Sequence, residues 1–340
     1  MEDSNLQTSK KSRDYEYRGA ILCGQVSRSV NTIKVHRLVR DGFATQEEFK
    51  KAIRQDRNLI LKSQKNFAFV SSGQSDWLDI LRPLAWTFQG FEKRSSSGED
   101  SIGPVTRWFR TNTFYRKPLV DCKISSNGNE LSSWLPKLSA KTGRGIVFLL
   151  GPYSFTKLVE NSYYKNDKEL ALDYSEAIAK NTANLDKLGY GCILLLEPAV
   201  GFDLFRKTFS KPRWFGQTLA RIKNAKGSKK IKLGVHFPLA DAKYVLPFVE
   251  NSAADFIGID GIYTDFKDVK TKKDVLLGIV DGARPTIETS EYLAKQTARF
   301  LENAEFSGTY YLGSNDRLSD VPFEIAMKKI SALAAFRPGK

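Results

Sequence analysis

The chain has 340 residues, 41% of them hydrophobic, and its 53 Lys and Arg exceed its 38 Asp and Glu to give a formal net charge of +15. Its apolar runs are far shorter than the ~18 consecutive apolar residues of a transmembrane helix, so we expect no membrane span. Residues 1–11 are polar without an apolar signal-peptide core, and the three cysteines stand far apart, which predicts a cytoplasmic protein without disulfides.

The first 16 residues are polar with little apolar periodicity, and we expect a disordered tail there. Short apolar runs typical of buried strands then follow: Ala20–Cys23, Phe67–Val70, Leu119–Ile124, Ile146–Leu150, Cys192–Leu196, Ile231–Val235, Phe256–Ile259, Val275–Val280 and Tyr310–Leu312. Helical patterns separate most of them: Thr45–Gln64, Asp167–Leu188, Ala240–Asn251, Ser290–Glu302 and Pro322–Ala335. Thr45 followed by Glu48 is a capping box, while Ser290 before Glu291 and Pro322 also match helix starts.

Alternating strands and helices predict a parallel sheet, and the nine runs are one more than a closed (β/α)8 barrel needs. Leu119–Ile124 is the run to exclude, because the long interval around residues 91–125 interrupts the alternation and is rich in Ser and Gly at 94–101. The sequence therefore predicts an α/β fold, a single (β/α)8 TIM barrel over residues 17–340 with a hairpin inserted around 91–125. An open doubly wound sheet is the alternative, although no Gly-rich phosphate loop opens a helix.

In such a barrel the functional residues follow the carboxyl ends of the strands. The segments at these positions are Gly24–Arg28, Ser71–Asp76, Gly151–Ser154, Glu197–Ala199, His236–Pro238, Asp260–Tyr263, Asp281–Arg284 and Gly313–Asp316.

Three segments carry a resemblance to the cobalamin-independent methionine synthase family. Val105–Tyr115 resembles the family's MTKWFDTNYHY, Leu149–Leu158 resembles LLGPVSFLxL, and Leu196–Leu204 resembles DEPALVLDL. Two of them are more similar to the N-terminal than to the C-terminal half of that family, whose members have two facing barrels. Weaker likeness extends over residues 19–336, which implies one barrel where the family has two.

The resemblance implies methionine biosynthesis, in which a methyl group passes from a methyl-pterin donor to homocysteine whose thiol is activated by zinc. The family's His-x-Cys reads His236-Phe237-Pro238 here, and its glutamate and second cysteine align with Asp260 and Asp316. Proline cannot ligate, so we expect zinc to be absent and assign no metal ligands. Alternatively, His236, Asp260 and Asp316 could together hold a different metal. We favour the simpler expectation that they are hydrogen-bonded residues at the ends of strands.

The homocysteine site also departs from the family, because Gln74 replaces a glutamate and Leu196 replaces an aspartate. Glu197 is retained, either as a polar group in the barrel mouth or as a buried carboxylate paired with an Arg or an amide. Glu197 and His236 are thus the catalytic candidates. Polar groups expected in the mouth are Gln74, Asp76, Ser154, Asp260, Asp281 and Asp316. His36, the other histidine, is expected to be solvated.

These residues and the resemblance favour a zinc-free subunit of the N-terminal-half type, inactive alone, that partners a separate zinc-containing methionine synthase barrel. Its positive charge suits a polyanionic methyl-pterin donor, whose tail we expect near Arg28 and Lys34. Trp108 and Phe109 are expected to pack the hairpin on the barrel end or, alternatively, to face a partner or a pterin ring.

Two other functions stay open: an independent methyltransferase with another donor or metal, and a polyanion-binding barrel using the basic run 211–232. Nucleic acid is disfavoured because no nucleic-acid-binding motif accompanies that run.

Overall fold

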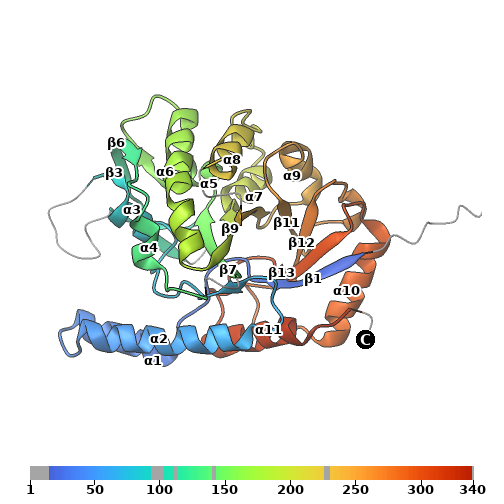
Figure 1. Ribbon diagram of the computed structural model, residues 1–340, viewed down its shortest axis with the longest axis horizontal. Helices are drawn as coiled ribbons and strands as arrows, with labels where there is room; N and C mark the ends of the chain where they lie inside the picture. Colours follow the sequence, from blue (N-terminus) through green and yellow to red (C-terminus); the bar gives the residue numbers. More distant parts are fainter. Residues whose placement is uncertain (1–14, 93–102, 110–112, 140–142, 226–229, 339–340) are drawn as a thin grey trace, which may run out of the picture.

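The core of the molecule is an eight-stranded parallel sheet rolled into a nearly closed barrel (Figure 1). The computed structural model describes residues 15–92, 103–109, 113–139, 143–225 and 230–338. The sheet order is β1-β13-β12-β11-β10-β9-β7-β2. Its strands are β1 (Glu16–Ile21), β2 (Val70–Ser71), β7 (Gly145–Leu150), β9 (Tyr190–Leu196), β10 (Lys232–Phe237), β11 (Phe256–Asp260), β12 (Asp274–Val280) and β13 (Thr309–Ser314). The predicted (β/α)8 fold is confirmed, and each barrel strand overlaps or adjoins a predicted run.

The seam between β1 and β2 is the weakest part of the barrel wall. An isolated parallel bridge joins Ala20 to Phe67, and the amide of Ala68 donates to the Ala20 carbonyl at 2.9 Å. Gly19 allows this approach, since a Cβ there would lie 2.8 Å from backbone atoms of Ala68 and Asn66 at a φ of +113°.

Helices cover the outside of the barrel. They are α1 (Val30–Arg40), α2 (Gln46–Ser63), α3 (Arg82–Thr87), α4 (Glu130–Trp134), α5 (Pro152–Leu158), α6 (Asp167–Lys187), α7 (Pro198–Phe205), α8 (Phe215–Lys223), α9 (Ala242–Val249), α10 (Ser290–Asn303) and α11 (Phe323–Ala335). The five predicted helices are confirmed, and Thr45 and Glu48 form the predicted capping box. Thr289, rather than Ser290, caps α10. Short α5 and α7 were missed because buried turns right after a strand show no amphipathic period.

The region around 91–125 contains two small sheets outside the barrel. One has the order β3 (Gln89–Phe91), β6 (Leu119–Ser125) and β8 (Glu160–Asn161), and the other is the hairpin of β4 (Val105–Arg107) and β5 (Phe114–Arg116). Excluding 119–124 from the barrel was therefore correct. Phe109, at the end of β4, stacks on Phe202 of α7 with ring centroids 4.4 Å apart, which places the hairpin on the carboxyl end of the barrel. The Ser/Gly-rich segment 94–101 lies outside the described residues.

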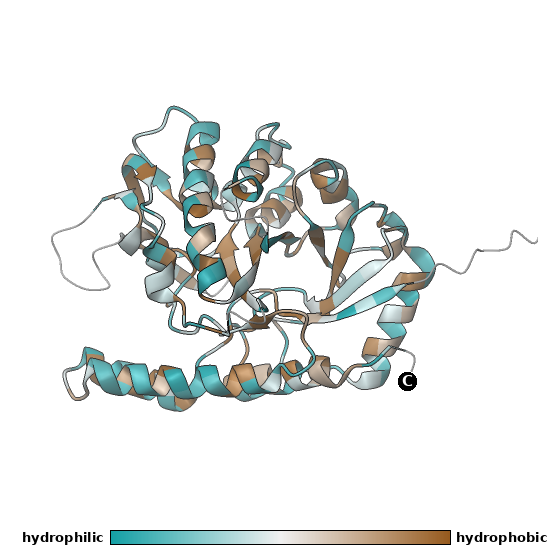
Figure 2. Cartoon of the chain, viewed as in Figure 1, coloured by the Kyte–Doolittle hydropathy of each residue, from teal (hydrophilic) through white to brown (hydrophobic). Residues whose placement is uncertain are grey.

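The amino-terminal helices lie apart from the ring of helices above the barrel. Figure 1 shows α1 and α2 running along one side of the molecule and projecting past the barrel below α3 and α4, with α11 beside α2. The barrel strands are largely hydrophobic, whereas α1 and α2 are largely hydrophilic (Figure 2). No helix among the described residues has the length and apolar character needed to cross a bilayer.

The fold begins slightly before the predicted end of the tail. β1 starts at Glu16, and Tyr15 stacks on Phe306 and donates its hydroxyl to the Leu301 carbonyl at 2.9 Å. The remaining residues of the predicted disordered tail, 1–14, lie outside the described residues.

Candidate functional site

Side chains fill the carboxyl-end mouth of the barrel, the place where (β/α)8 enzymes carry their active sites. Trp108 comes from the β4–β5 hairpin and Arg317 from the segment after β13, and the guanidinium carbon of Arg317 lies 4.9 Å from the indole centroid. The cavity left at the mouth measures about 20 Å³, and its lining includes Trp108, Arg317, Leu150, Leu196, Pro198, Pro238 and Asp316. Such a cavity holds a water molecule but not an amino acid.

Gly24 at the end of β1 makes room for this closure. Its φ is +125°, and a Cβ would lie 2.9 Å from Cβ of Arg317 and 3.4 Å from Cδ1 of Leu196. A larger residue would be strained in this conformation and would displace Arg317. The closed mouth thus depends on backbone geometry as well as on Trp108.

Glu197 is fully buried at the end of β9 and is bound by backbone amides. Tyr153 donates to Oε1 at 3.0 Å, and Ser154 donates to Oε2 at 2.7 Å. Burial raises the pKa of Glu197 to about 7, while these hydrogen bonds act to lower it. Buried Ser154 also accepts from the Ala199 amide at 3.0 Å. Glu197 and Ser154 therefore tie the turn after β7 to the turn after β9, and the carboxylate is amide-paired.

His236 on β10 belongs to a buried polar network. Its Nε2 lies 2.6 Å from the Asn315 carbonyl oxygen, so this nitrogen carries the proton in that contact. The Asn315 side chain donates to Asp260 at 3.1 Å, and Asp260 also accepts the amides of Leu239 at 2.8 Å and Ile262 at 3.0 Å. Burial lowers the pKa of His236 to about 4 and raises that of Asp260 to about 7.

Of the three residues considered for an alternative metal site, Asp316 is the one that lines the small mouth cavity. It accepts the Arg317 amide at 2.7 Å, and burial raises its pKa to about 6. Across the described parts of the chain, no group of three or more His, Cys, Asp or Glu is arranged to hold a metal ion. The metal site considered for His236, Asp260 and Asp316 is therefore not assembled, and the residues at the resembled family's zinc positions do not fit zinc.

The side chain of Gln74 forms hydrogen bonds within the barrel wall. Its Nε2 donates to the Phe148 carbonyl at 3.0 Å and its Oε1 accepts the Phe148 amide at 2.6 Å. The buried amide thereby extends the short pairing between β2 and β7. Gln74, predicted as a polar group in the mouth, thus makes its side-chain hydrogen bonds to the backbone of β7.

Two further residues predicted for the mouth, Asp76 and Asp281, are engaged by neighbouring groups. Asp76 pairs with Arg57 of α2 at 3.1 Å and lines a cleft outside the barrel. Asp281 accepts the amides of Ala283 at 2.9 Å and Arg284 at 3.2 Å, which caps its own loop. Asp76 therefore faces the outer cleft, whereas the carboxylate of Asp281 is engaged by the backbone of its own loop.

Arg28 lines a larger cavity of about 660 Å³ beside the mouth. The walls of this cavity come from the segment after β1, residues 75–80, the β4–β5 hairpin and residues 317–322. The cavity's carboxylates are paired, Asp79 with Arg82 at 2.7 Å and Asp320 with Arg317 at 3.2 Å. Lys34 lies exposed on α1 and is not part of the cavity lining, although its neighbour Ile33 is.

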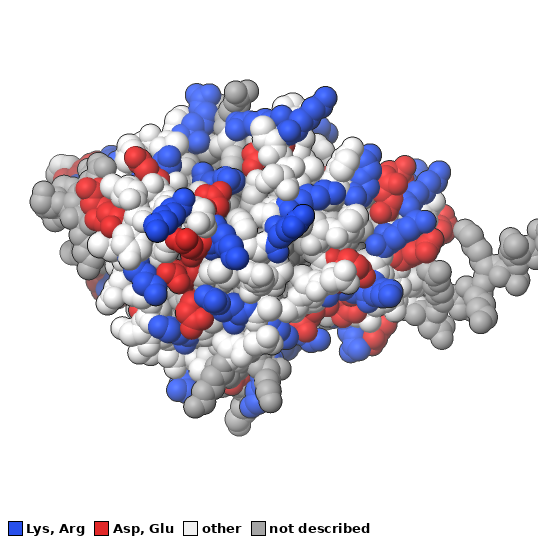
Figure 3. Space-filling model, turned by 90° about the horizontal axis from the view of Figure 1, so that it is seen from above, with Lys and Arg blue, Asp and Glu red and all other residues white. Residues whose placement is uncertain are grey.

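Within the described residues of the basic run 211–232, two cations lie next to carboxylates. Lys223 pairs with Asp255 at 2.6 Å, and Arg221 lies 3.9 Å from Glu176. Figure 3 shows Lys and Arg interspersed with Asp and Glu over the face seen from above. This arrangement gives no support to the polyanion-binding alternative.

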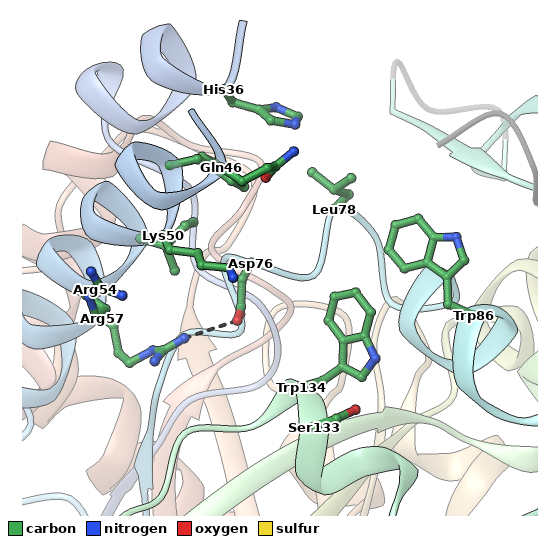
Figure 4. A pocket seen from close by; sticks show the side chains of 12 residues that line it. His36, Gln46, Lys50, Arg54, Arg57, Asp76, Leu78, Trp86, Ser133 and Trp134 are labelled. Atoms are coloured by element: carbon green, nitrogen blue, oxygen red, sulfur yellow. Dashed lines mark hydrogen bonds and ion pairs between the residues drawn. The ribbon is translucent and has the colours of Figure 1, made fainter. Parts of the chain in front are cut away.

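The largest of the cavities described here was missed by sequence reasoning. It is a cleft of about 750 Å³ between α2 on one side and α3 and α4 on the other (Figure 4). Its residues are His36, Gln46, Phe49, Lys50, Ile53, Arg54, Arg57, Asp76, Leu78, Trp86, Ser133 and Trp134. They come from separate segments that only the fold brings together. His36, expected to be solvated, is half-buried and stacks on Phe49 with centroids 4.6 Å apart.

Known proteins were compared with this chain by sequence and by structure. Methionine synthase of Saccharolobus solfataricus is 26% identical over 59% of this chain and 60% of its own length, so that match spans less than two-thirds of the relative. Methionine synthase of Saccharolobus islandicus strain L.S.2.15 is 24% identical over 78% of each chain. The structure of a B12-independent methionine synthase from Shewanella sp. W3-18-1 superposes with a TM-score of 0.67 at 18% identity, covering 95% of this chain and 96% of that chain.

A family model supplies the assignment. The model for the N-terminal domain of cobalamin-independent synthase matches residues 95–298, which is more than half of the chain. The match includes the hairpin that closes the mouth and five of the eight barrel strands, β7 and β9–β12. The chain is a methionine-synthase-like barrel and belongs to the cobalamin-independent synthase N-terminal domain family.

Proposed function

We propose that this chain is the zinc-free barrel of a methionine synthase system and supports methyl transfer that takes place on a separate zinc-bearing barrel. One observation carries the proposal: the mouth is closed by Trp108 and Arg317. In addition, both carboxylate oxygens of Glu197, the side-chain amide of Gln74 and Nε2 of His236 make hydrogen bonds within the fold. A chain built this way has no open position for homocysteine in its own mouth.

The proposed binding of the methyl donor rests on charge. The substrate would be a methyl-pterin with a polyglutamate tail, and a net charge of +15 favours encounter with such an anion. Arg28 presents a cation in the larger cavity beside the closed mouth. The two carboxylates of that cavity, Asp79 and Asp320, are already paired with arginines. We expect Arg28 to contribute more to tail binding than Lys34, which lies exposed on α1.

The test combines the purified full chain with a zinc-containing methionine synthase barrel and follows methionine formation with mono- and triglutamate donors. The chain alone is expected to form no methionine, and the mixture to use the triglutamate donor with a KM several-fold below that of the partner alone. Arg28→Glu is expected to abolish the gain. Lys65→Glu is the matched control, because Lys65 is exposed just before β2, at the opposite end of the barrel.

Two results would overturn the proposal. One is methionine formation by the chain alone with stoichiometric bound metal. The other is a mixture in which the chain neither binds the zinc-bearing barrel nor changes its use of the triglutamate donor.

A further inference from the structure

The cleft between α2 and the α3–α4 pair, hereafter the α2–α4 cleft, has two chemically different walls. Figure 4 shows Lys50 and Arg57 on the α2 side and Trp86 and Trp134 on the other, with Asp76 and Leu78 between them. Its volume of about 750 Å³ is within the range of pockets that enclose small organic ligands. The cleft lies outside the barrel and shares none of the residues discussed for the mouth cavity.

The aromatic wall is a stacked pair of half-buried indoles. The rings of Trp86 and Trp134 are 5.2 Å apart between centroids and inclined by 13°. Their helices are fixed from behind, since Asp79 accepts the amides of Leu81 and Arg82 before α3 and Asn181 of α6 accepts the Leu131 amide of α4. A flat, preorganised π-surface facing a cleft is suited to stacking a planar ring.

The opposite wall is a basic stripe. Lys50, Arg54 and Arg57 are spaced i, i+4 and i+7, so they project from one face of α2. Arg57 is held by Asp76 at 3.1 Å, and Arg54 by Glu47 at 2.7 Å. Three cations are thus accompanied by two carboxylates, and Lys50 makes no ion pair or hydrogen bond with the described residues. The wall keeps a positive charge that an anionic group can use.

We propose that the α2–α4 cleft binds a planar heterocyclic compound with an anionic tail, its ring against Trp134 and Trp86 and its anionic group at Lys50. A pterin carrying glutamates and a nucleoside phosphate share this chemistry, and both are possible sources of the ligand. Lys50 supplies the charge contact, and Arg57, oriented by Asp76, borders the same space. The inference does not depend on the proposed function, because it concerns a different cavity and needs no partner barrel.

The test is calorimetric titration of the full chain with pteroyltriglutamate, ADP and adenosine. At least one anionic probe is expected to bind with a dissociation constant below about 1 mM, and ADP more tightly than adenosine if the nucleotide is the ligand. Lys50→Glu is expected to weaken that binding about tenfold, whereas Lys51→Glu, an exposed neighbour outside the cleft lining, leaves it within about twofold. Trp134→Leu is expected to weaken it by a similar factor through loss of stacking.

The pattern of results separates the sources. Binding of pteroyltriglutamate alone that Lys50→Glu weakens identifies a pterin ligand of the cleft, and such binding of ADP alone identifies a nucleotide. If neither probe binds, or if Lys50→Glu and Lys51→Glu weaken binding equally, the assignment of the cleft is overturned. Should Trp134→Leu fail to fold, Lys50→Glu still decides, because Lys50 is exposed on a capped helix.

Discussion

The guanidinium of Arg317 lies over the indole of Trp108, with 4.9 Å between the guanidinium carbon and the ring centroid. This contact joins the inserted hairpin to the segment after the last barrel strand. The indole also meets Tyr115 edge-on with centroids 5.5 Å apart. The hairpin is therefore part of the barrel's closure and should contribute to its stability.

Trp108→Ala should lower the free energy of unfolding by about 3–5 kcal/mol, because it removes a large side chain that is only 7% exposed. Urea denaturation measures the loss. Phe114→Ala is the matched control on the same hairpin, since Phe114 is 53% exposed and its removal should cost under about 1 kcal/mol. Equal small losses for both variants would contradict the packing of the hairpin on the mouth.

Ionisation of Glu197 should destabilise the fold as pH rises. Its pKa is raised by burial from 4.5 to about 7, so the native state keeps a proton that the unfolded state has lost between these values. Stability present below about pH 4.5 is therefore lost as pH rises through about 7, by on the order of 3 kcal/mol at most.

Glu197→Gln has no such proton, and its stability relative to the native chain should increase from pH 4.5 to 8. The raised pKa values of Asp260 and Asp316 also make stability fall as pH rises, whereas the lowered pKa of His236 makes it rise. The quantity to measure is therefore the difference in free energy of unfolding between the variant and the native chain. Exposed Glu160→Gln serves as the control. A difference that stays constant over this pH range would refute a raised pKa at Glu197.

His236 should remain uncharged at neutral pH, because burial lowers its pKa to about 4. The chain has two histidines, so the His36→Asn variant leaves one imidazole signal in an NMR spectrum. That signal should titrate near pH 4 and should not respond to added zinc. A midpoint at or above 6.5, or a zinc-dependent shift, would mean that the ring is open to solvent or to metal.

Gln74→Glu should destabilise the barrel by about 1–3 kcal/mol, although it restores the residue type of the resembled family. A carboxylate can accept the Phe148 amide but cannot donate to the Phe148 carbonyl, which would be left unpaired in the interior. Thermal denaturation with the exposed Gln217→Glu as control measures the effect. If both variants are equally stable, the side-chain bridge between β2 and β7 does not hold the barrel wall.

The sequence by itself determined the order of strands and helices, because short apolar runs and capping patterns depend on residues close together in the chain. Such local patterns predicted the eight barrel strands, the α2 capping box and the exclusion of 119–124 from the barrel. The segments at 149–158 and 196–204 also pointed to the family that the comparison then matched.

Tertiary structure alone decided what the polar residues do. Glu197, Gln74 and His236 follow or occupy strands as predicted. Their partners Ser154, Phe148 and Asn315 lie on other elements, 43 to 79 residues away in the chain. The α2–α4 cleft likewise combines Lys50 with Trp134, which no local pattern connects. A hydrogen bond or a stacking surface is set by distances within the folded chain, and these depend on how the loops turn after each strand.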